Sequence, residues 1–190
     1  MPNWCENTLE IYGEEDKMKE FYDFFGGQDK FLDNFCFNNI KTMPQELDGT
    51  RSPSTIVSQE TYDRYTELEK KHNIKDTNDV FKLVEDGTIT EEERDLVWAE
   101  GITQEMSDKL KSEYGYDNWY DWRNNNWGTK WDIKTEVHVD DLHDEGCTLI
   151  FQTAWSPPEP IVDKLQEMFP DITFYGGYIG EGWEFAGVFE

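Results

Sequence analysis

Basic residues are scarce in this sequence. It contains 17 Lys and Arg against 42 Asp and Glu, so its formal net charge is −25. Proteins that bind nucleic acid regardless of sequence need cationic side chains to neutralise phosphates. Anionic membrane surfaces likewise attract basic segments. The composition therefore argues against direct binding to nucleic acid and against binding to a membrane surface.

Long apolar runs and paired cysteines are also missing. No run approaches the ~20 apolar residues that a membrane-spanning helix needs. The start of the chain, MPNWCENTLE, has neither the basic segment nor the apolar core of a secretion signal. Cys5, Cys36 and Cys147 are far apart, so we expect neither a disulfide framework nor a zinc ribbon. These absences favour a cytoplasmic location.

Recognisable catalytic signatures are absent as well. The sequence contains no GxxxxGKS/T phosphate loop, no GxSxG elbow, no HExxH helix and no GxGxxG turn. Residues 86–93 copy the second half of a calcium-binding loop, but Lys82 and Val84 stand where oxygen ligands are required. We therefore expect no enzymatic activity, no cofactor and no bound metal.

Aromatic residues are abundant, with 8 Trp, 9 Tyr and 12 Phe. Such large apolar side chains argue against a disordered chain despite its high charge. Hydrophobic alternation predicts strands at 7–12, 133–140 and 147–154, with a hairpin turn at 141–146. Two more strands are expected at 172–175, which Gly176-Gly177 is expected to bend, and at 183–189.

Helical patterns fall into two groups. One helix follows the first strand and ends at Gly26-Gly27, and a second begins at Ser156-Pro157-Pro158-Glu159, read as a capping box. Residues 48–113 are predicted to form an inserted helical subdomain. Its helices are expected at 59–72, before Gly87, after the Thr90–Glu93 capping box and around residues 106–110.

Without the insert, the order is strand, helix, strand, strand, helix, strand, followed by one extra strand. This is the order of the ferredoxin-like split βαβ arrangement, in which two helices cover one face of an antiparallel sheet. The sequence therefore predicts an α+β fold whose ferredoxin-like core consists of residues 1–47 and 114–190.

Two stretches bear candidate binding residues. The predicted hairpin gathers His138, Asp140, Asp141, His143, Asp144, Glu145 and Cys147. Such groups can hold a divalent metal that supports hydrolysis, although their spacing matches no established ligand pattern. The second stretch contains Trp119, Tyr120, Trp122, Trp127 and Trp131, which belong either to the core or to a surface that contacts a partner.

Six segments in order carry a resemblance to a known family: 1–7 (MPNWCEN), 43–47 (MPQEL), 119–122 (WYDW), 126–132 (NWGTKWD), 153–158 (TAWSPP) and 185–187 (FAG). Together they resemble the YubB-like ferredoxin-domain family of bacteriophages, plasmids and related mobile elements. The resemblance covers residues 1–47 and about 114–190. It implies a ferredoxin-like fold and a mobile-element setting inside a bacterial cell, and it implies no reaction.

We therefore hypothesise an acidic, non-enzymatic phage or mobile-element protein that mimics nucleic acid. It inhibits a host protein, a nucleic-acid-handling defence factor, by occupying its basic surface. The oligomeric state stays open. The candidate partner-binding residues are Asp140, Asp141, Asp144, Glu145, Trp122, Trp127, Glu91 and Glu92.

Two alternatives to this hypothesis remain open. One is a metal-dependent hydrolase whose site is the hairpin at 138–147. The other is a protein that sequesters a small molecule in a pocket lined by Trp155, Tyr175 and Tyr178. An anionic ligand would need Lys130 and Arg123 to point into that pocket.

Overall fold

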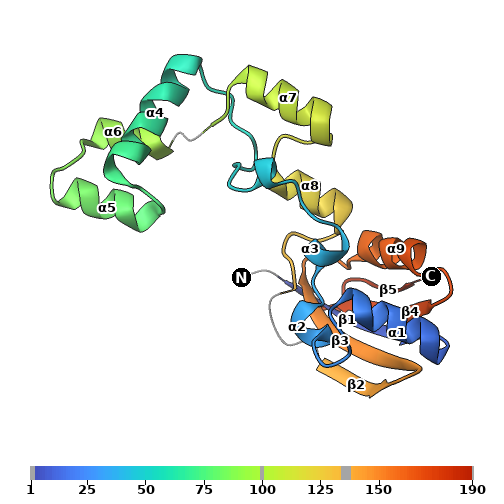
Figure 1. Ribbon diagram of the computed structural model, residues 1–190. Helices are drawn as coiled ribbons and strands as arrows, with labels where there is room; N and C mark the ends of the chain where they lie inside the picture. The colour runs from blue at the N-terminus through green and yellow to red at the C-terminus, as the bar shows by residue number, and fades with distance from the viewer. Residues whose placement is uncertain (1–2, 99–100, 134–137, 190) are drawn as a thin grey trace. The chain divides into compact units, whose positions relative to one another are not determined.

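The computed structural model describes residues 3–98, 101–133 and 138–189 (Figure 1). The chain divides into two compact units, one formed by Met1–Met43 with Arg123–Glu190 and the other by Pro44–Trp122. The second unit contains the predicted insert, 48–113, and extends beyond it at both ends.

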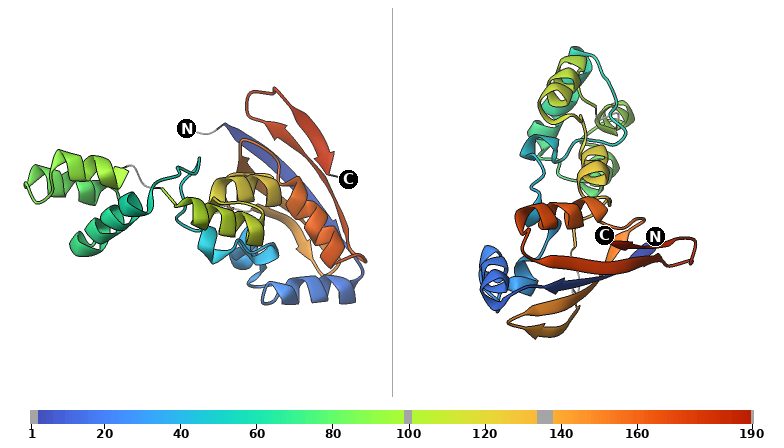
Figure 2. Two further views of the ribbon diagram at one scale, coloured as in Figure 1. Left: turned by 90° about the horizontal axis from the view of Figure 1, so that it is seen from above. Right: turned by 90° about the vertical axis from the view of Figure 1, so that its right-hand side faces the viewer.

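The first unit is built on a five-stranded sheet in the order β2-β3-β1-β4-β5, with every neighbouring pair antiparallel. Helices α1 and α9 lie on one side of it (Figure 2). This arrangement confirms the predicted ferredoxin-like α+β fold, with β5 added beside β4. The elements are β1 (Trp4–Tyr12), α1 (Glu15–Phe24), β2 (His138–His143), β3 (Gly146–Ala154), α9 (Glu159–Met168), β4 (Thr173–Gly180) and β5 (Ala186–Phe189).

The core of the first unit lies between the sheet and its helices. Alternate residues of a strand face opposite sides. Leu9 and Ile11 of β1 are buried, as are Phe21 of α1 and Leu165 of α9. The Phe21 ring lies 5.1 Å from the Phe169 ring in an edge-to-face arrangement that favours aromatic pairs. The short helices α2 (Phe31–Asn34) and α3 (Phe37–Ile40) add further buried aromatic side chains.

The second unit is helical. Val80, Ile89 and Val97 form its small buried cluster, against which Leu68 and Ile74 pack. The predicted helix at 59–72 is confirmed, and the Ser58 hydroxyl accepts a hydrogen bond from the Thr61 N–H at its start. The elements are η1 (Gln45–Leu47), α4 (Gln59–His72), α5 (Thr77–Glu85), α6 (Glu91–Trp98) and α7 (Gln104–Tyr114), while α8 (Trp119–Asn126) contains the boundary between the units.

The predicted capping box at Thr90 is also confirmed, and it provides a direct test. The Glu93 N–H donates to the Thr90 hydroxyl at 3.1 Å, and the Glu93 carboxylate accepts from the Thr90 N–H at 2.8 Å. The Thr90 hydroxyl also donates to the Glu93 carboxylate at 3.0 Å, and the two hydrogen bonds that this carboxylate accepts from Thr90 lower the pKa of Glu93. We expect Thr90→Ala to reduce the free energy of unfolding by about 1 kcal/mol. NMR titration should show the Glu93 pKa rising, while a pKa that does not rise would contradict the cap.

Three local predictions need correction. Strand β2 continues through Asp141 to His143, with a register shift after Asp140, so the turn consists of residues 144–145 alone. Helix α9 begins at Glu159 without a side-chain cap, because the Ser156 hydroxyl instead donates to the Gly128 carbonyl at 2.5 Å. The strand predicted at 172–175 is longer, because β4 continues through Gly176, where a Cβ would lie 2.0 Å from the Thr8 carbonyl oxygen, to Gly180. Most of the predicted strand at 133–140 lies outside the described residues.

Candidate acidic binding surface

A groove of about 720 Å³ lies on the first unit where α1, the segment after it and the β2–β3 turn meet. Six carboxylates line it, against one ammonium group, that of Lys19. Lys19 forms an exposed ion pair with Asp23 at 2.5 Å, and exposed pairs of this kind contribute little to stability. We call this feature the acidic groove; its carboxylates are Glu14, Glu15, Asp16, Asp23, Asp29 and Asp144.

Tyr22 lines the acidic groove and connects the elements that form it. Its hydroxyl donates to the His143 carbonyl at 3.1 Å and to the Gly146 carbonyl at 3.2 Å, which ties α1 to the β2–β3 turn. The Gly13 N–H donates to the Glu145 carbonyl at 3.1 Å and secures the end of β1 to the same turn. These hydrogen bonds hold α1, the end of β1 and the β2–β3 turn together, and these elements carry carboxylates of the groove.

The four hairpin acids proposed from the sequence are all exposed, namely Asp140, Asp141, Asp144 and Glu145. Only Asp144 lines the acidic groove. Asp141 has a φ of 53°, at the point where the β2–β3 register shifts. A bulge of this kind bends a strand and redirects its side chains, so the four acids do not lie along one flat ribbon.

The structure does not support the metal site proposed for the hairpin at 138–147. Cys147 faces the covered side of the sheet and is 1% exposed, and burial raises the pKa of its thiol to about 11. Metal-binding cysteines act as thiolates. The Nδ1 atom of His143 accepts a hydrogen bond from the Glu145 N–H at 3.1 Å. Among the residues that the structure describes, no three His, Cys, Asp or Glu side chains gather as a metal site.

The two tryptophans proposed as partner contacts are buried. Trp122 is 6% exposed and Trp127 is 1% exposed, so neither side chain can bind a partner without unfolding. The Trp127 indole N–H donates to the Lys41 carbonyl at 2.8 Å, its ring packs against Phe37, and the Arg123 guanidinium lies 4.9 Å from its centroid. Trp127 therefore belongs to the core of the first unit.

The remaining proposed residues, Glu91 and Glu92, are exposed in the first turn of α6 in the second unit. Carboxylates at this position are favoured by the partial positive charge of a helix N-terminus. Their local role is therefore to stabilise α6.

The proposed small-molecule pocket is not formed. Tyr175 and Tyr178 are three residues apart on β4, so their side chains point to opposite faces of the sheet. Tyr175 is 55% exposed, whereas the Tyr178 hydroxyl donates to Glu159 of α9 at 2.8 Å. The Lys130 ammonium lies 4.8 Å from the Trp131 ring centroid, and Trp155 is 59% exposed with a φ of 76°.

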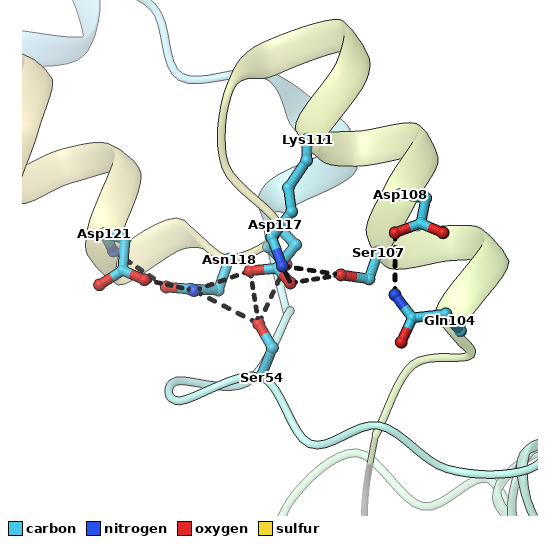
Figure 3. A network of polar contacts seen from close by, with 8 residues as sticks. All are labelled: Ser54, Gln104, Ser107, Asp108, Lys111, Asp117, Asn118 and Asp121. Carbon is cyan, nitrogen blue, oxygen red and sulfur yellow. Dashed lines mark hydrogen bonds and ion pairs between the residues drawn. The ribbon is translucent and has the colours of Figure 1, made fainter.

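The second unit contains a polar network centred on Asp117, whose side chain is 8% exposed (Figure 3). Its carboxylate accepts from the Ser107 hydroxyl at 2.5 Å and from the Ser54 hydroxyl at 2.8 Å, and it pairs with the Lys111 ammonium at 2.8 Å. The Asn118 amide donates to Asp117 at 3.2 Å and to Asp121 at 2.8 Å. The network joins α7 and the start of α8 to the segment around Ser54.

This network resembles a serine–lysine catalytic pair in composition only. Such a pair needs a neutral lysine to accept the serine proton. Here the hydrogen bond with Asp117 raises the pKa of Lys111, and the Ser107 hydroxyl, fully buried, donates to Asp117 rather than to Lys111. The arrangement therefore holds a structural junction together and does not activate a nucleophile.

Two of the segments that carry the family resemblance, 126–132 and 153–158, contact each other in the first unit through hydrogen bonds and close packing. The fully buried Thr129 hydroxyl donates to the Ala154 carbonyl at 2.8 Å, and the Thr153 hydroxyl donates to the Ser156 carbonyl at 2.7 Å. Gly128 has a φ of 78°, and a Cβ there would lie 2.6 Å from the Pro157 carbonyl oxygen. These contacts therefore hold the segment around Gly128 and Thr129 against the end of β3 and the start of α9.

The sequence alone did not reveal the acidic groove. In the sequence, Glu14, Glu15 and Asp16 have the pattern of acids that favour the start of a helix. The run of three adjacent acids was a visible signal, but Asp144 comes near them only through the pairing of β1 with β3.

The fold and these contacts define a ferredoxin-like α+β protein with an acidic groove. Residues 127–190 match the family model described as the ferredoxin-like domain in Api92-like protein. That match supports the resemblance at the level of a ferredoxin-domain family, and it includes β2, β3, α9, β4 and β5.

Among solved structures, the chain is similar to the crystal structure of a protein api92 from Yersinia pseudotuberculosis. The two are 12% identical, with a TM-score of 0.40, over 99% of this chain and 93% of that chain. No curated protein matches. Within the described residues, no helix is both long and apolar enough to cross a membrane.

Proposed function

We propose that this protein is a non-enzymatic binding protein that inhibits a host protein by occupying its basic surface. The observation that carries the proposal is the acidic groove, where six carboxylates face one lysine that is already paired. A concave anionic surface attracts a cationic partner and accelerates its association.

The charge balance supports the same proposal. If every one of the 17 Lys and Arg paired with a separate carboxylate, 42 − 17 = 25 carboxylates would still lack a cationic side chain of their own. A basic protein surface that normally holds nucleic acid offers the missing cations. The resemblance to a mobile-element family suggests that this partner is a nucleic-acid-handling defence factor in the host bacterial cytoplasm.

The test is capture of bacterial proteins by the full chain at about 0.05 M and about 0.5 M salt, because screening of exposed charges grows over this range. The groove variant is Glu15→Gln/Asp29→Asn/Asp144→Asn. The control variant is Glu60→Gln/Glu67→Gln/Glu105→Gln, which removes the same charge from exposed positions in the second unit.

We expect the wild type and the control variant to capture a nucleic-acid-binding protein at low salt and to inhibit its activity. The groove variant and high salt should both abolish capture. Capture that survives in the groove variant, or at high salt, would show that the acidic groove is not the binding surface. Equal loss in both variants would mean that net charge alone directs binding.

A further inference from the structure

The face of the sheet opposite α1 and α9 exposes a row of apolar and aromatic side chains. Tyr12, Ile150, Tyr175 and Val188 are 38–55% exposed. The strand register sets Thr8 between Ile150 and Gly177, and it sets Val188 beside Gly177. These side chains therefore belong to one continuous surface that crosses β3, β1, β4 and β5, which we call the open face.

Two tryptophans extend the open face at one end. Trp4 alternates with the buried Cys5, so it lies on the same side of β1 as Glu6 and Thr8. The Trp131 ring packs against Trp4 with their centroids 6.2 Å apart, and Trp131 is 36% exposed. Exposed aromatic side chains of this size are typical of protein interaction surfaces.

The five described strands contribute carboxylates to the open face and no cationic Lys or Arg side chain. Glu6, Glu10 and Asp140 interrupt the apolar side chains, and the Tyr12 hydroxyl donates to Glu10 at 3.2 Å. The ammonium of Lys130 lies 4.8 Å from the centroid of Trp131 at the end of this face, which shows that one of its rings accepts a cation.

We propose that the open face binds a cationic, amphipathic segment of the partner protein, with arginine or lysine alternating with apolar side chains. The apolar residues of that segment would contact Ile150 and Tyr175, and its cations would pair with Glu6 and Glu10. The inference rests on the proposed function, since both require a basic partner, and it specifies a second surface and the chemistry that this surface selects.

Two other occupants fit the open face less well. Aromatic faces that stack nucleic-acid bases work beside cationic grooves that hold the phosphates, and here Glu6, Glu10 and Asp140 would repel phosphates. A second copy of this chain would bring the same carboxylates opposite one another, at an electrostatic cost.

The probes are two synthetic peptides of equal length and charge, one alternating arginine with leucine and the other alternating arginine with serine. The face variant Ile150→Thr/Tyr175→Thr removes apolar area but retains residues that favour strands. The groove variant defined above and Trp183→Ala, a change at an 83% exposed residue in the β4–β5 turn, serve as controls.

We expect the full chain to bind the arginine–leucine peptide at least about tenfold more tightly than the arginine–serine peptide, and the face variant to lose about that factor. Peptide-induced NMR shifts in the wild type should centre on Thr8, Ile150 and Gly177. The two control variants should retain the preference for leucine.

Equal affinity for both peptides, or NMR shifts confined to the acidic groove, would overturn the inference. Since the NMR experiment uses the wild type, it remains decisive even if the face variant fails to fold. Dimerisation through the open face in sedimentation, or shifts there caused by single-stranded DNA, would also overturn it. If the groove variant abolishes capture while the open face shows no shifts, the proposed function stands and this inference alone fails.

Discussion

Replacing Trp127 by alanine is expected to reduce the free energy of unfolding by about 3–5 kcal/mol, the usual cost of removing a large buried aromatic side chain. Trp127 is 1% exposed, and its ring packs against Phe37. The substitution also leaves the Lys41 carbonyl without the indole N–H that it accepts at 2.8 Å. Loss of this partly buried hydrogen bond adds to the cost of the cavity.

Urea denaturation followed by far-ultraviolet circular dichroism measures this effect without relying on tryptophan fluorescence. Trp183→Ala is the matched control, because Trp183 is 83% exposed and we expect its loss to change the free energy of unfolding by less than about 0.5 kcal/mol. Similar losses for both substitutions would contradict the assignment of Trp127 to the core.

The fold was accessible from the sequence because its signals are local. Alternation in residues 7–12 and 147–154 identified β1 and β3, and the order of strands and helices left few arrangements of the sheet. The errors came where tertiary contacts compete with a local pattern. Ser156 has the spacing of a helix cap, yet its hydroxyl is used by the Gly128 carbonyl, which lies 28 residues earlier in the chain.

The candidate site was less accessible because binding surfaces depend on burial and on distant neighbours. Trp127 and Trp183 are the same residue type, and only packing makes one of them core and the other surface. Asp144 and Glu15 become neighbours through strand pairing. Tyr175 and Tyr178 lie on opposite faces because β4 continues to Gly180, whereas the sequence predicts a strand that ends at residue 175.

The polar network of the second unit should make stability depend on pH through Asp117. Burial by itself raises the pKa of this carboxyl group, but hydrogen bonds from Lys111 and Ser107, followed by those from Ser54 and Asn118, outweigh burial and hold the pKa well below its usual range. The ordinary value of 3.8 applies to the unfolded chain. On acidification the unfolded chain therefore takes up the proton first, so the stabilisation is complete above about pH 4 and is lost as the pH falls further.

We expect Asp117→Asn to lower the free energy of unfolding at neutral pH by about 1.5–3 kcal/mol, as for loss of hydrogen bonds to a charged group. The gap between the wild type and this variant should narrow steadily below pH 4, because Asp117 of the unfolded wild-type chain binds a proton there while the folded chain does not, which favours unfolding of the wild type. Asp108→Asn is the matched control, since it makes the same change in charge at an exposed residue whose side chain accepts from Gln104. Denaturant titrations of the three proteins across this pH range measure the gap directly. A gap that stays constant with pH, or an equal loss in Asp108→Asn, would show that Asp117 does not stabilise the unit through its ionised form.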